Sequence, residues 1–328
     1  MLWMPSTHKR KRGGATNRMN LRFSAPDPGF EARLAGLRAG VERHLEAVTP
    51  GEASPQNLAD AMRYCLLAPA KRARALLTIL SAVHCGAGDD DALNAACALE
   101  MVHASSLILD DLPAMDDAAL RRGRETCHRI YGEATAVLAA IALMNRAFGL
   151  VAEDEELPPD RRVQVIAILA RSIGTDGLTG GQEGDLHGVG ITGAAGVEWI
   201  HARKTGALFA AATEIGAVVA GNSEHRMAMH AFGMNLGLAF QAYDDLLDAR
   251  AASATVGKDT GRDGGKATLV KLEGFDAALS QADRQMQEAL RCAPNLATGE
   301  GLLARYVTGL TAMMRGQLEV PAAPVPNA

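Results

Sequence analysis

Two groups of aspartates, widely separated in the sequence, constrain most strongly what this chain can fold into. The first group follows an apolar run of small residues and consists of Asp110, Asp111, Asp116 and Asp117. Carboxylates this close repel one another unless a cation lies between them, and hard divalent metals with oxygen ligands commonly fill that role. Two arginines follow at 121–122, which indicates that the metals would hold an anion such as a phosphate. A solvated acidic loop would explain this first group equally well.

The second group of aspartates weakens that simpler explanation. Asp244 and Asp248 are four residues apart, and Gln241 precedes Asp244 by three, so a helix would place all three on one face with Asp245 at its edge. Like charges at this spacing destabilise an isolated helix, so a compensating cation is again implied. A glycine-rich basic loop follows at 257–268. The two groups are most simply two walls of one metal–diphosphate site.

The composition and the spacing of apolar residues favour helices over strands. Hydrophobic residues make up 48% of the chain but aromatic residues only 4%, so the apolar positions are mostly aliphatic. No useful length of chain alternates with the period of a strand. The first helical pattern recurs at three and four residues in Phe30, Leu34, Leu37, Val41 and Leu45. We therefore predict an all-α protein.

Turn-forming and polar residues divide the remaining chain into helical segments. Helices are predicted at 56–67, 75–84, 92–109, 134–151, 161–173, 199–221, 224–247, 275–290 and 301–318. We predict one domain over 25–318, preceded by a disordered basic arm at 1–24 and followed by a disordered, proline-containing tail at 319–328. Met19 is an alternative start, which would leave most of the arm untranslated.

Charge, cysteines and hydropathy exclude several classes of protein. The net charge of −5 argues against a nucleic-acid-binding surface. The five cysteines are scattered, so we expect a reducing cytoplasm and no structural zinc. The longest apolar run, 134–144, ends at Asn145 and Arg146 and is too short for a membrane span. We predict that it forms a buried helix and that the protein does not insert stably into a membrane.

The chain resembles the trans-isoprenyl diphosphate synthases, in particular bacterial geranylgeranyl and farnesyl diphosphate synthases, over roughly 30–292. The resemblance rests on motifs that occur in the family's order. They are Asp-Asp-x4-Asp at 110–116, Arg-Arg-Gly at 121–123, Gly-Gly-Gln-x2-Asp-Leu at 180–186, Lys-Thr-Gly at 204–206 and Phe-Gln-x2-Asp-Asp-x2-Asp at 240–248. The resemblance implies an isoprenoid-synthase helical bundle around a central active-site cavity, and a homodimer. It also implies Mg²⁺ as cofactor, about three ions, with Mn²⁺ as the alternative.

The resemblance assigns roles to individual side chains. Those implied in metal binding are Asp110, Asp111, Asp116 and Asp244, with Asp111 in an assisting role. Asp245, Asp248 and Lys204 would assist catalysis. The residues implied to bind isopentenyl diphosphate are Lys71, Arg74, His103 and Arg122. Those implied to contact the allylic diphosphate or to line its site are Arg121, Lys204, Thr205, Gln241, Lys258 and Lys266.

Structural explanations compete with several of these roles. Lys71 and Arg74 share a helix face and could be surface residues whose stems cover apolar surface. His103 could be a core histidine with its hydrogen bonds satisfied, and Lys204 could lie on the surface. The chain also departs from the family at Pro69-Ala70 and Ala75, at Leu109, at Ala118-Ala119 and at Ala140-Ile141, and the spacing from Asp263 to Lys266 is shorter than in relatives.

Product length is expected to depend on the helix before Asp110. Side chains four and five positions back lie about one turn deeper, and here they are Ser106 and Ser105. An aromatic residue at either position would block a tunnel for the growing chain, whereas serine leaves it open. The alternative is that Ser105 packs against a neighbouring helix and that a deeper residue, Met101 or Ala98, sets the floor.

The predicted function is head-to-tail condensation of isopentenyl diphosphate with an allylic diphosphate, giving geranylgeranyl diphosphate. Farnesyl diphosphate is the alternative product. A class I terpene cyclase is less favoured because it would need one diphosphate subsite only. A non-catalytic regulatory subunit is the alternative from another class, but such a subunit would be expected to lose one acidic motif, and both are present.

Overall fold

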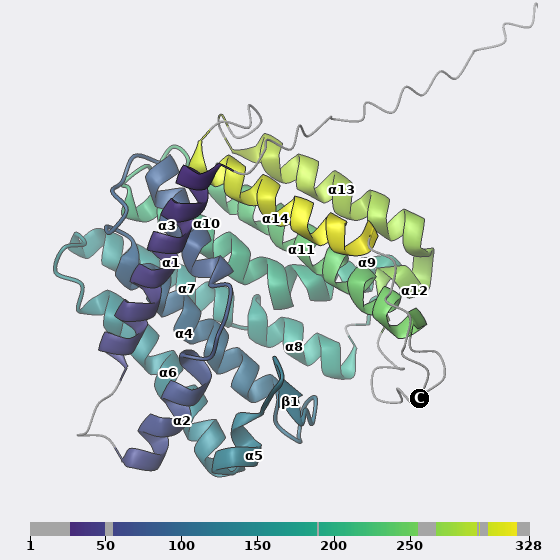
Figure 1. Ribbon diagram of the computed structural model, residues 1–328, viewed down its shortest axis with the longest axis horizontal. Coiled ribbons are helices and arrows are strands. Elements are labelled where there is room, and N and C mark those ends of the chain that lie inside the picture. Colours follow the sequence, from purple (N-terminus) through teal and green to yellow (C-terminus); the bar gives the residue numbers. More distant parts are fainter. Residues whose placement is uncertain are drawn as a thin grey trace, which may run out of the picture.

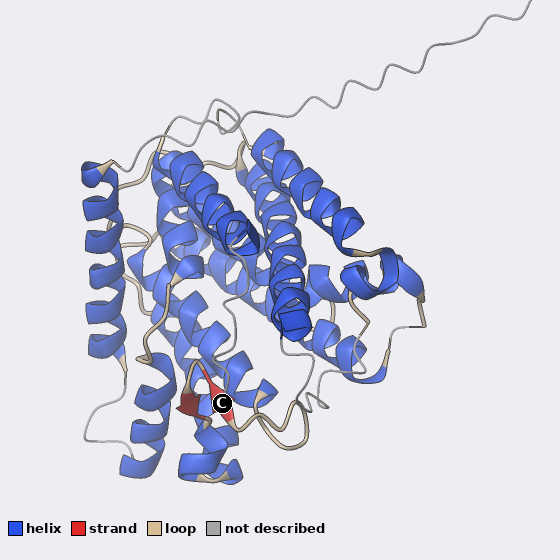
Figure 2. Ribbon diagram, turned by 45° about the vertical axis from the view of Figure 1, so that its right-hand side comes forward, coloured by secondary structure: helices blue, strands red, loops and turns tan. Residues whose placement is uncertain are grey.

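The computed structural model describes residues 27–49, 55–188, 190–254, 267–293, 295 and 301–319, and nearly all of its regular structure is helical (Figure 2). The predicted all-α fold is confirmed. The predicted basic arm at 1–24 lies outside the described residues. So does the predicted tail, except for Glu319, which ends the last helix.

Helix α1, Pro28–Val48, shows why the opening sequence becomes a helix. The side chain of Asp27 accepts hydrogen bonds from the backbone N–H groups of Gly29 and Phe30, and Pro28 occupies the first turn, where its missing N–H costs nothing. The helix buries Leu34, Val41 and Leu45, in agreement with the predicted period.

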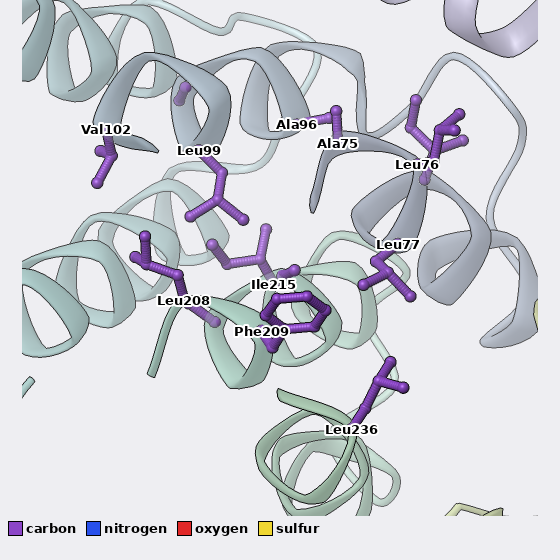
Figure 3. Close-up of a cluster of buried hydrophobic side chains, with 14 of the residues drawn as sticks. Ala75, Leu76, Leu77, Ala96, Leu99, Val102, Leu208, Phe209, Ile215 and Leu236 are labelled. Atoms are coloured by element: carbon purple, nitrogen blue, oxygen red, sulfur yellow. The ribbon is translucent and has the colours of Figure 1, made fainter. Parts of the chain in front are cut away.

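Four helices form the centre of the molecule: α3 (Ala73–His84), α4 (Leu93–Asp110), α10 (Ala207–Val219) and α11 (Arg226–Ala254). Helix α10 packs against α3 on one side and against α11 on another, so nearly all its side chains are buried. Figure 3 shows Leu77 of α3 and Leu99 of α4 lying near Phe209 and Ile215 of α10. This packing fixes the end of α4, where the first acidic motif begins, and the C-terminal half of α11, which carries the second.

The other elements surround this centre (Figure 1). They are α2 (Gln56–Leu66), β1 (Leu120–Arg121), β2 (Arg124–Glu125), α5 (Cys127–Tyr131), α6 (Glu133–Ala152), α7 (Pro159–Ile173), α8 (Leu178–His187), α9 (Gly193–His201), η1 (Ala202–Gly206), α12 (Leu269–Glu273), α13 (Phe275–Cys292) and α14 (Leu302–Glu319). Helices α13 and α14 both pack against α11 and run beside it in Figure 1.

Helix α6 is longer than the sequence analysis predicted, because Asn145 and Arg146 lie within it rather than at its end. By length and composition alone it is the one helix in the described part of the chain that could cross a membrane. It packs against α4, α2, α5 and α7, as a core helix does. One face is buried, but Leu138 and Ile141 are 54% and 51% exposed, so the helix is not wholly buried.

Two local features were not predicted. The segment expected as one helix over 199–221 consists of α9, the π-helical η1 and α10. A π segment adds a residue to a helix and commonly occurs at functional sites. The two-residue strands β1 and β2 pair antiparallel around a turn in which Arg122 and Gly123 both have positive φ. Strands this short give no alternating pattern from which they could be predicted.

Candidate active site

The first acidic motif begins where α4 ends. Pro113 prevents the helix from continuing, and the chain folds back so that the backbone N–H of Asp116 donates to the carbonyl oxygen of Asp110 at 2.9 Å. Burial raises the pKa of Asp110 above its ordinary value. Lys204 lowers this pKa, whereas Asp116 raises it further. The turn therefore brings two carboxylates together beside one lysine.

Asp111 occupies a different environment from Asp110. Its side chain is buried, and its Oδ1 accepts a hydrogen bond from Nε of Arg121 at 2.7 Å. Burial raises the pKa of Asp111, and the Arg121 guanidinium opposes that shift. Asp111 thus connects α4 to the β1–β2 hairpin, which is consistent with an assisting role rather than direct metal ligation.

The second acidic motif lies on α11, and Gln241 makes a contact within it that the sequence did not indicate. Nε2 of Gln241 donates to Oδ1 of Asp245, four residues on, at 3.0 Å. Its Oε1 accepts from the Thr205 hydroxyl at 2.7 Å. Asp245 is buried, with Nε2 of His201, the last residue of α9, 3.5 Å from its other oxygen. Asp245 therefore lies between Gln241 and His201.

Asp244 carries the most perturbed pKa among the motif aspartates. Burial and the charges of Asp248 and Asp245 raise it from 3.8 to about 6, while Lys71 and Arg74 act in the opposite direction. Asp248 is exposed. Two basic residues that were assigned to substrate binding therefore lie close enough to Asp244 to influence its charge.

Lys204 is placed by the π segment. Its Nζ contacts Oδ2 of Asp185 on α8 at 2.7 Å, and it also influences the pKa of Asp110. On the same α8, Gln182 is buried, with Nε2 3.6 Å from the sulfur of Met115. Its Oε1 is buried without a hydrogen-bond partner. Lys204 therefore joins the wall formed by α8 to the first acidic motif, and it is only partly exposed.

A pocket of about 110 Å³ lies beside the first motif. Its walls come from the end of α2, one face of α4, and the hairpin with the start of α5. Among the predicted site residues it is lined by His103, Arg121, Arg122 and Asp111. Arginines thus gather at this cavity, and guanidinium groups suit a phosphate-containing ligand.

His103 is the centre of this cationic group. Burial lowers the pKa of His103 well below its ordinary value, and four arginines lower it further, so the imidazole is neutral at pH 7. Its Nε2 lies 3.2 Å from Nη1 of Arg74. Burial lowers the pKa of Arg74 to about 10, and Arg122 contributes in the same direction. The four arginines are Arg72, Arg74, Arg121 and Arg122.

Lys71 lies at the edge of this arrangement. It is exposed, and its Nζ is 3.8 Å from the sulfur of Met313 on α14. Its charge lowers the pKa of Asp244, so Lys71 acts on the second acidic motif.

The sequence analysis missed the ion pairs of Arg72, which anchor the loop between Lys71 and Arg74. Arg72 has a positive φ of 50°, and its buried guanidinium contacts Glu42 at 2.7 Å and Glu100 at 3.6 Å. Glu100 also accepts a hydrogen bond from the backbone N–H of Ala75, in the first turn of α3. Glu100, the single carboxylate of the mostly apolar 92–109 segment, was the available signal.

The hydroxyls of the two candidate chain-length residues, Ser105 and Ser106, are both bonded to backbone carbonyl oxygens. Ser105 is fully buried, and its hydroxyl donates to the carbonyl oxygen of Ala140 on α6 at 2.8 Å. Ser106 donates to the carbonyl oxygen of His103 in its own helix at 2.8 Å. The position of Ser105 matches the alternative in which it packs against a neighbouring helix.

Lys258 and Lys266 lie outside the described residues. Within the described residues, no three His, Cys, Asp or Glu side chains stand close enough together to hold a metal ion by themselves. The donor set nevertheless fits Mg²⁺, because it consists of carboxylates, and burial together with neighbouring carboxylates raises the pKa of Asp110 and Asp244. One oxygen of Asp245 is also buried without a hydrogen bond.

Comparison with known proteins agrees with this arrangement. Residues 55–299 match the family model described as polyprenyl synthetase. A protein of Pantoea ananas named geranylgeranyl diphosphate synthase is 42% identical over 257 residues, covering 77% of this chain and 84% of that protein. The large subunit 2 of a heterodimeric geranylgeranyl pyrophosphate synthase of Arabidopsis thaliana is 37% identical over 284 residues, covering 84% and 74%.

Solved structures show the same fold. A structure from Zymomonas mobilis described as an FPP/GFPP synthase matches with a TM-score of 0.75 and 31% identity, covering 88% of this chain and 99% of that one. A geranyltranstransferase structure from Thermotoga maritima matches with a TM-score of 0.74 and 28% identity, covering 87% and 99%.

The helical bundle, with two aspartate-rich motifs facing a set of lysines and arginines, defines a prenyltransferase of the isoprenoid-synthase fold. Within that class, the chain belongs to the polyprenyl synthetase family.

Proposed function

We propose that the protein condenses isopentenyl diphosphate head-to-tail with an allylic diphosphate and releases geranylgeranyl diphosphate. The observation that carries the proposal is the pairing of two separate acidic motifs with cations: Lys204 acts on Asp110, while Lys71 and Arg74 act on Asp244. The names of the relatives from Pantoea ananas and Arabidopsis thaliana support the product.

The cationic pocket would hold isopentenyl diphosphate through Arg122, whose guanidinium group suits diphosphate oxygens. Neutral His103 adds a hydrogen bond without further positive charge. Arg74 is not among the lining residues, but its Nη1 lies 3.2 Å from Nε2 of His103, and it would contact the diphosphate from that side. Because Asp111 also lines the pocket, the bound substrate would lie beside the first acidic motif.

The acidic motifs would hold the allylic diphosphate through Mg²⁺, with Asp110, Asp116 and Asp244 as ligands. Bound Mg²⁺ would supply charge neutralisation for the leaving diphosphate. Lys204 and Arg121 stabilise the same developing negative charge. The allylic carbon–oxygen bond breaks, the double bond of isopentenyl diphosphate attacks the cation, and a proton passes to the released diphosphate.

Farnesyl diphosphate is the second candidate product, because solved structures with this fold are described as FPP/GFPP synthase and geranyltranstransferase. A regulatory subunit without activity is less well supported. Both acidic motifs and the basic residues of the described site are present, and such a subunit would have no need for them.

Incubation of the purified protein with Mg²⁺, isopentenyl diphosphate and each allylic primer, followed by sizing of the products, tests the proposal. We expect geranylgeranyl diphosphate as the main product and none after chelation of the metal. Farnesyl diphosphate as the end product would favour the second candidate. No product with any primer would favour the regulatory subunit.

We further propose that the protein is a homodimer. The observation in support is the exposure of Leu138 and Ile141 on one face of α6, since exposed apolar side chains that lie together commonly mark contact surfaces. Analytical ultracentrifugation should give twice the chain mass. Leu138→Glu should shift the protein toward the monomer, whereas Arg284→Ala on the exposed face of α13 should not.

A further inference from the structure

Two cysteines, Cys65 and Cys127, line the cationic pocket from different elements. Cys65 lies in the last turn of α2 and is half-buried, and Cys127 is the first residue of α5 and is 3% exposed. The proposed condensation uses neither thiol. Of the five cysteines in the chain, these are the two that face this pocket.

Tyr64, next to Cys65, fastens the two pocket walls together. Its hydroxyl donates to the carbonyl oxygen of Glu125 at 2.8 Å, and the Arg124 guanidinium lies 4.0 Å from its ring centroid. The rings of Tyr64 and Tyr131 are in edge contact, with centroids 5.7 Å apart. These contacts join the end of α2 to the hairpin and to α5, and they keep Cys65 opposite Cys127.

The two thiols face the same pocket and influence each other's ionisation. The neighbouring Cys65 thiol lowers the pKa of Cys127. The Cys127 thiol, together with burial, raises the pKa of Cys65. Cys127 is therefore the better nucleophile of the two, because the thiolate is the reactive form.

We propose that Cys65 and Cys127 are an oxidation site at which peroxide forms a disulfide across the cationic pocket and thereby impairs binding of the diphosphate ligand. Formation of the bond depends on the thiols alone. The loss of substrate binding rests on the proposed function.

Hydrogen peroxide is the oxidant, and the reaction has two steps. The Cys127 thiolate attacks one peroxide oxygen, which breaks the O–O bond, gives a sulfenic acid and releases water after protonation. The Cys65 sulfur then attacks the Cys127 sulfur, the S–O bond breaks, and a second water leaves. Two thiols lose two electrons and two protons in total, and one peroxide is reduced to two waters.

The bond would change the shape of the pocket. The bond would draw the two sulfur atoms together to about 2.0 Å. The start of α5 continues directly from the hairpin that carries Arg121 and Arg122, whereas His103 stays on α4. Drawing α5 toward α2 would therefore shift these arginines relative to His103.

Peptide mapping of the full-length protein before and after peroxide treatment tests the proposal. We expect a linked Cys65–Cys127 peptide pair, a mass lower by two hydrogen atoms, and a KM for isopentenyl diphosphate raised about tenfold, or about 1.4 kcal/mol. Dithiothreitol should reverse all of these changes. In Cys65→Ser we expect no linked peptide and a dimedone adduct on Cys127. Cys85→Ser is the matched control, since Cys85 is a half-buried thiol outside the pocket, and it should respond as the wild type does.

Unlinked peptides after treatment, or a linked protein with an unchanged KM, would overturn the proposal. Circular dichroism of Cys65→Ser and Cys127→Ala shows whether each variant is folded. If the protein makes no prenyl product at all, the proposed function fails, and the peptide map still decides whether the disulfide forms.

Discussion

Some carboxylates in the site carry negative charge that neighbouring basic residues do not fully neutralise. Asp244 is the clearest case, since burial and two neighbouring aspartates raise its pKa to about 6. The folded chain therefore binds a proton at Asp244 more tightly than the unfolded chain, whose carboxyl has a pKa near 3.8. As pH rises from about 4 to about 6, the unfolded state becomes relatively favoured and the free energy of unfolding falls.

Replacing Asp244 with Asn should therefore stabilise the metal-free protein near neutral pH. We expect a gain of about 1–3 kcal/mol at about pH 8, which disappears at about pH 4, where the wild-type carboxyl is protonated. Urea unfolding in the presence of a chelator measures the gain. The same variant should lack turnover, because a metal ligand is gone. Normal turnover in Asp244→Asn would contradict the model of two acidic walls.

The two diphosphate subsites should respond differently to loss of charge. Lys71→Ala and Arg74→Ala should each weaken isopentenyl diphosphate binding by about 1.5–3 kcal/mol, because each removes a charge-assisted contact. Allylic binding should change much less. Steady-state kinetics with each substrate varied in turn measures the difference. Arg284→Ala, an exposed arginine on α13, is the control, and equal losses for both substrates would show that the subsite is wrongly assigned.

At the scale of elements, the loop between α2 and α3 depends on a contact with α4. Arg72 and Glu100 form this contact, and Glu100 also receives the N–H of Ala75 at the start of α3. The bend at Arg72, with its positive φ, needs such support, since an arginine rarely adopts this conformation.

Glu100→Gln keeps the shape of the side chain but removes the buried charge beside Arg72. We expect a loss of about 1–3 kcal/mol in stability and a higher KM for isopentenyl diphosphate, with a smaller effect on kcat. Thermal unfolding and kinetics test this result together. A stability loss with an unchanged KM would mean that the pair supports the core and does not position the loop.

The contact between α4 and α6 is the place to test product length. Because Ser105 is fully buried against Ala140, Ser105→Tyr must displace α6 or fill space along α4, at a cost of about 1–3 kcal/mol. The Tm should fall, and a tyrosine that extends along α4 into the tunnel would shorten the main product to farnesyl diphosphate. Ser105→Ala should keep the product. An unchanged product in Ser105→Tyr would place the floor deeper, at Met101 or Ala98.

The sequence predicted helices well but side-chain partners less well. Apolar spacing located α1 because one face of a helix must be buried, and the acidic motifs located both walls because carboxylates rarely cluster without a cation. The partner of Gln241 was missed, since periodicity alone does not say whether residue i+3 or i+4 faces η1. The Arg72–Glu100 pair joins residues far apart in sequence, and only the packing of α3 on α4 reveals it.

For the whole molecule, the acidic walls come from α4 and α11, which the central α10 holds at their relative positions. Ligands that bridge these walls should therefore stabilise the complete fold. Mg²⁺ with inorganic diphosphate, present at about 100 times the dissociation constant, should raise the free energy of unfolding by about 2.7 kcal/mol. Mg²⁺ alone or diphosphate alone should raise the free energy of unfolding by less. Differential scanning calorimetry measures the shift, and Asp244→Asn should abolish the joint effect.

The π segment η1 makes the number of residues between α9 and α10 a functional property in its own right. Removing one residue from 202–206 would allow a continuous α-helix, and each residue of such a helix turns about 100°. Lys204 or Thr205 would then point away from its present partner, although the chain could still fold. In an alignment of related sequences, we therefore expect a one-residue gap at 202–206 to accompany a change of activity. A gap of the same size in a surface loop should have no such effect.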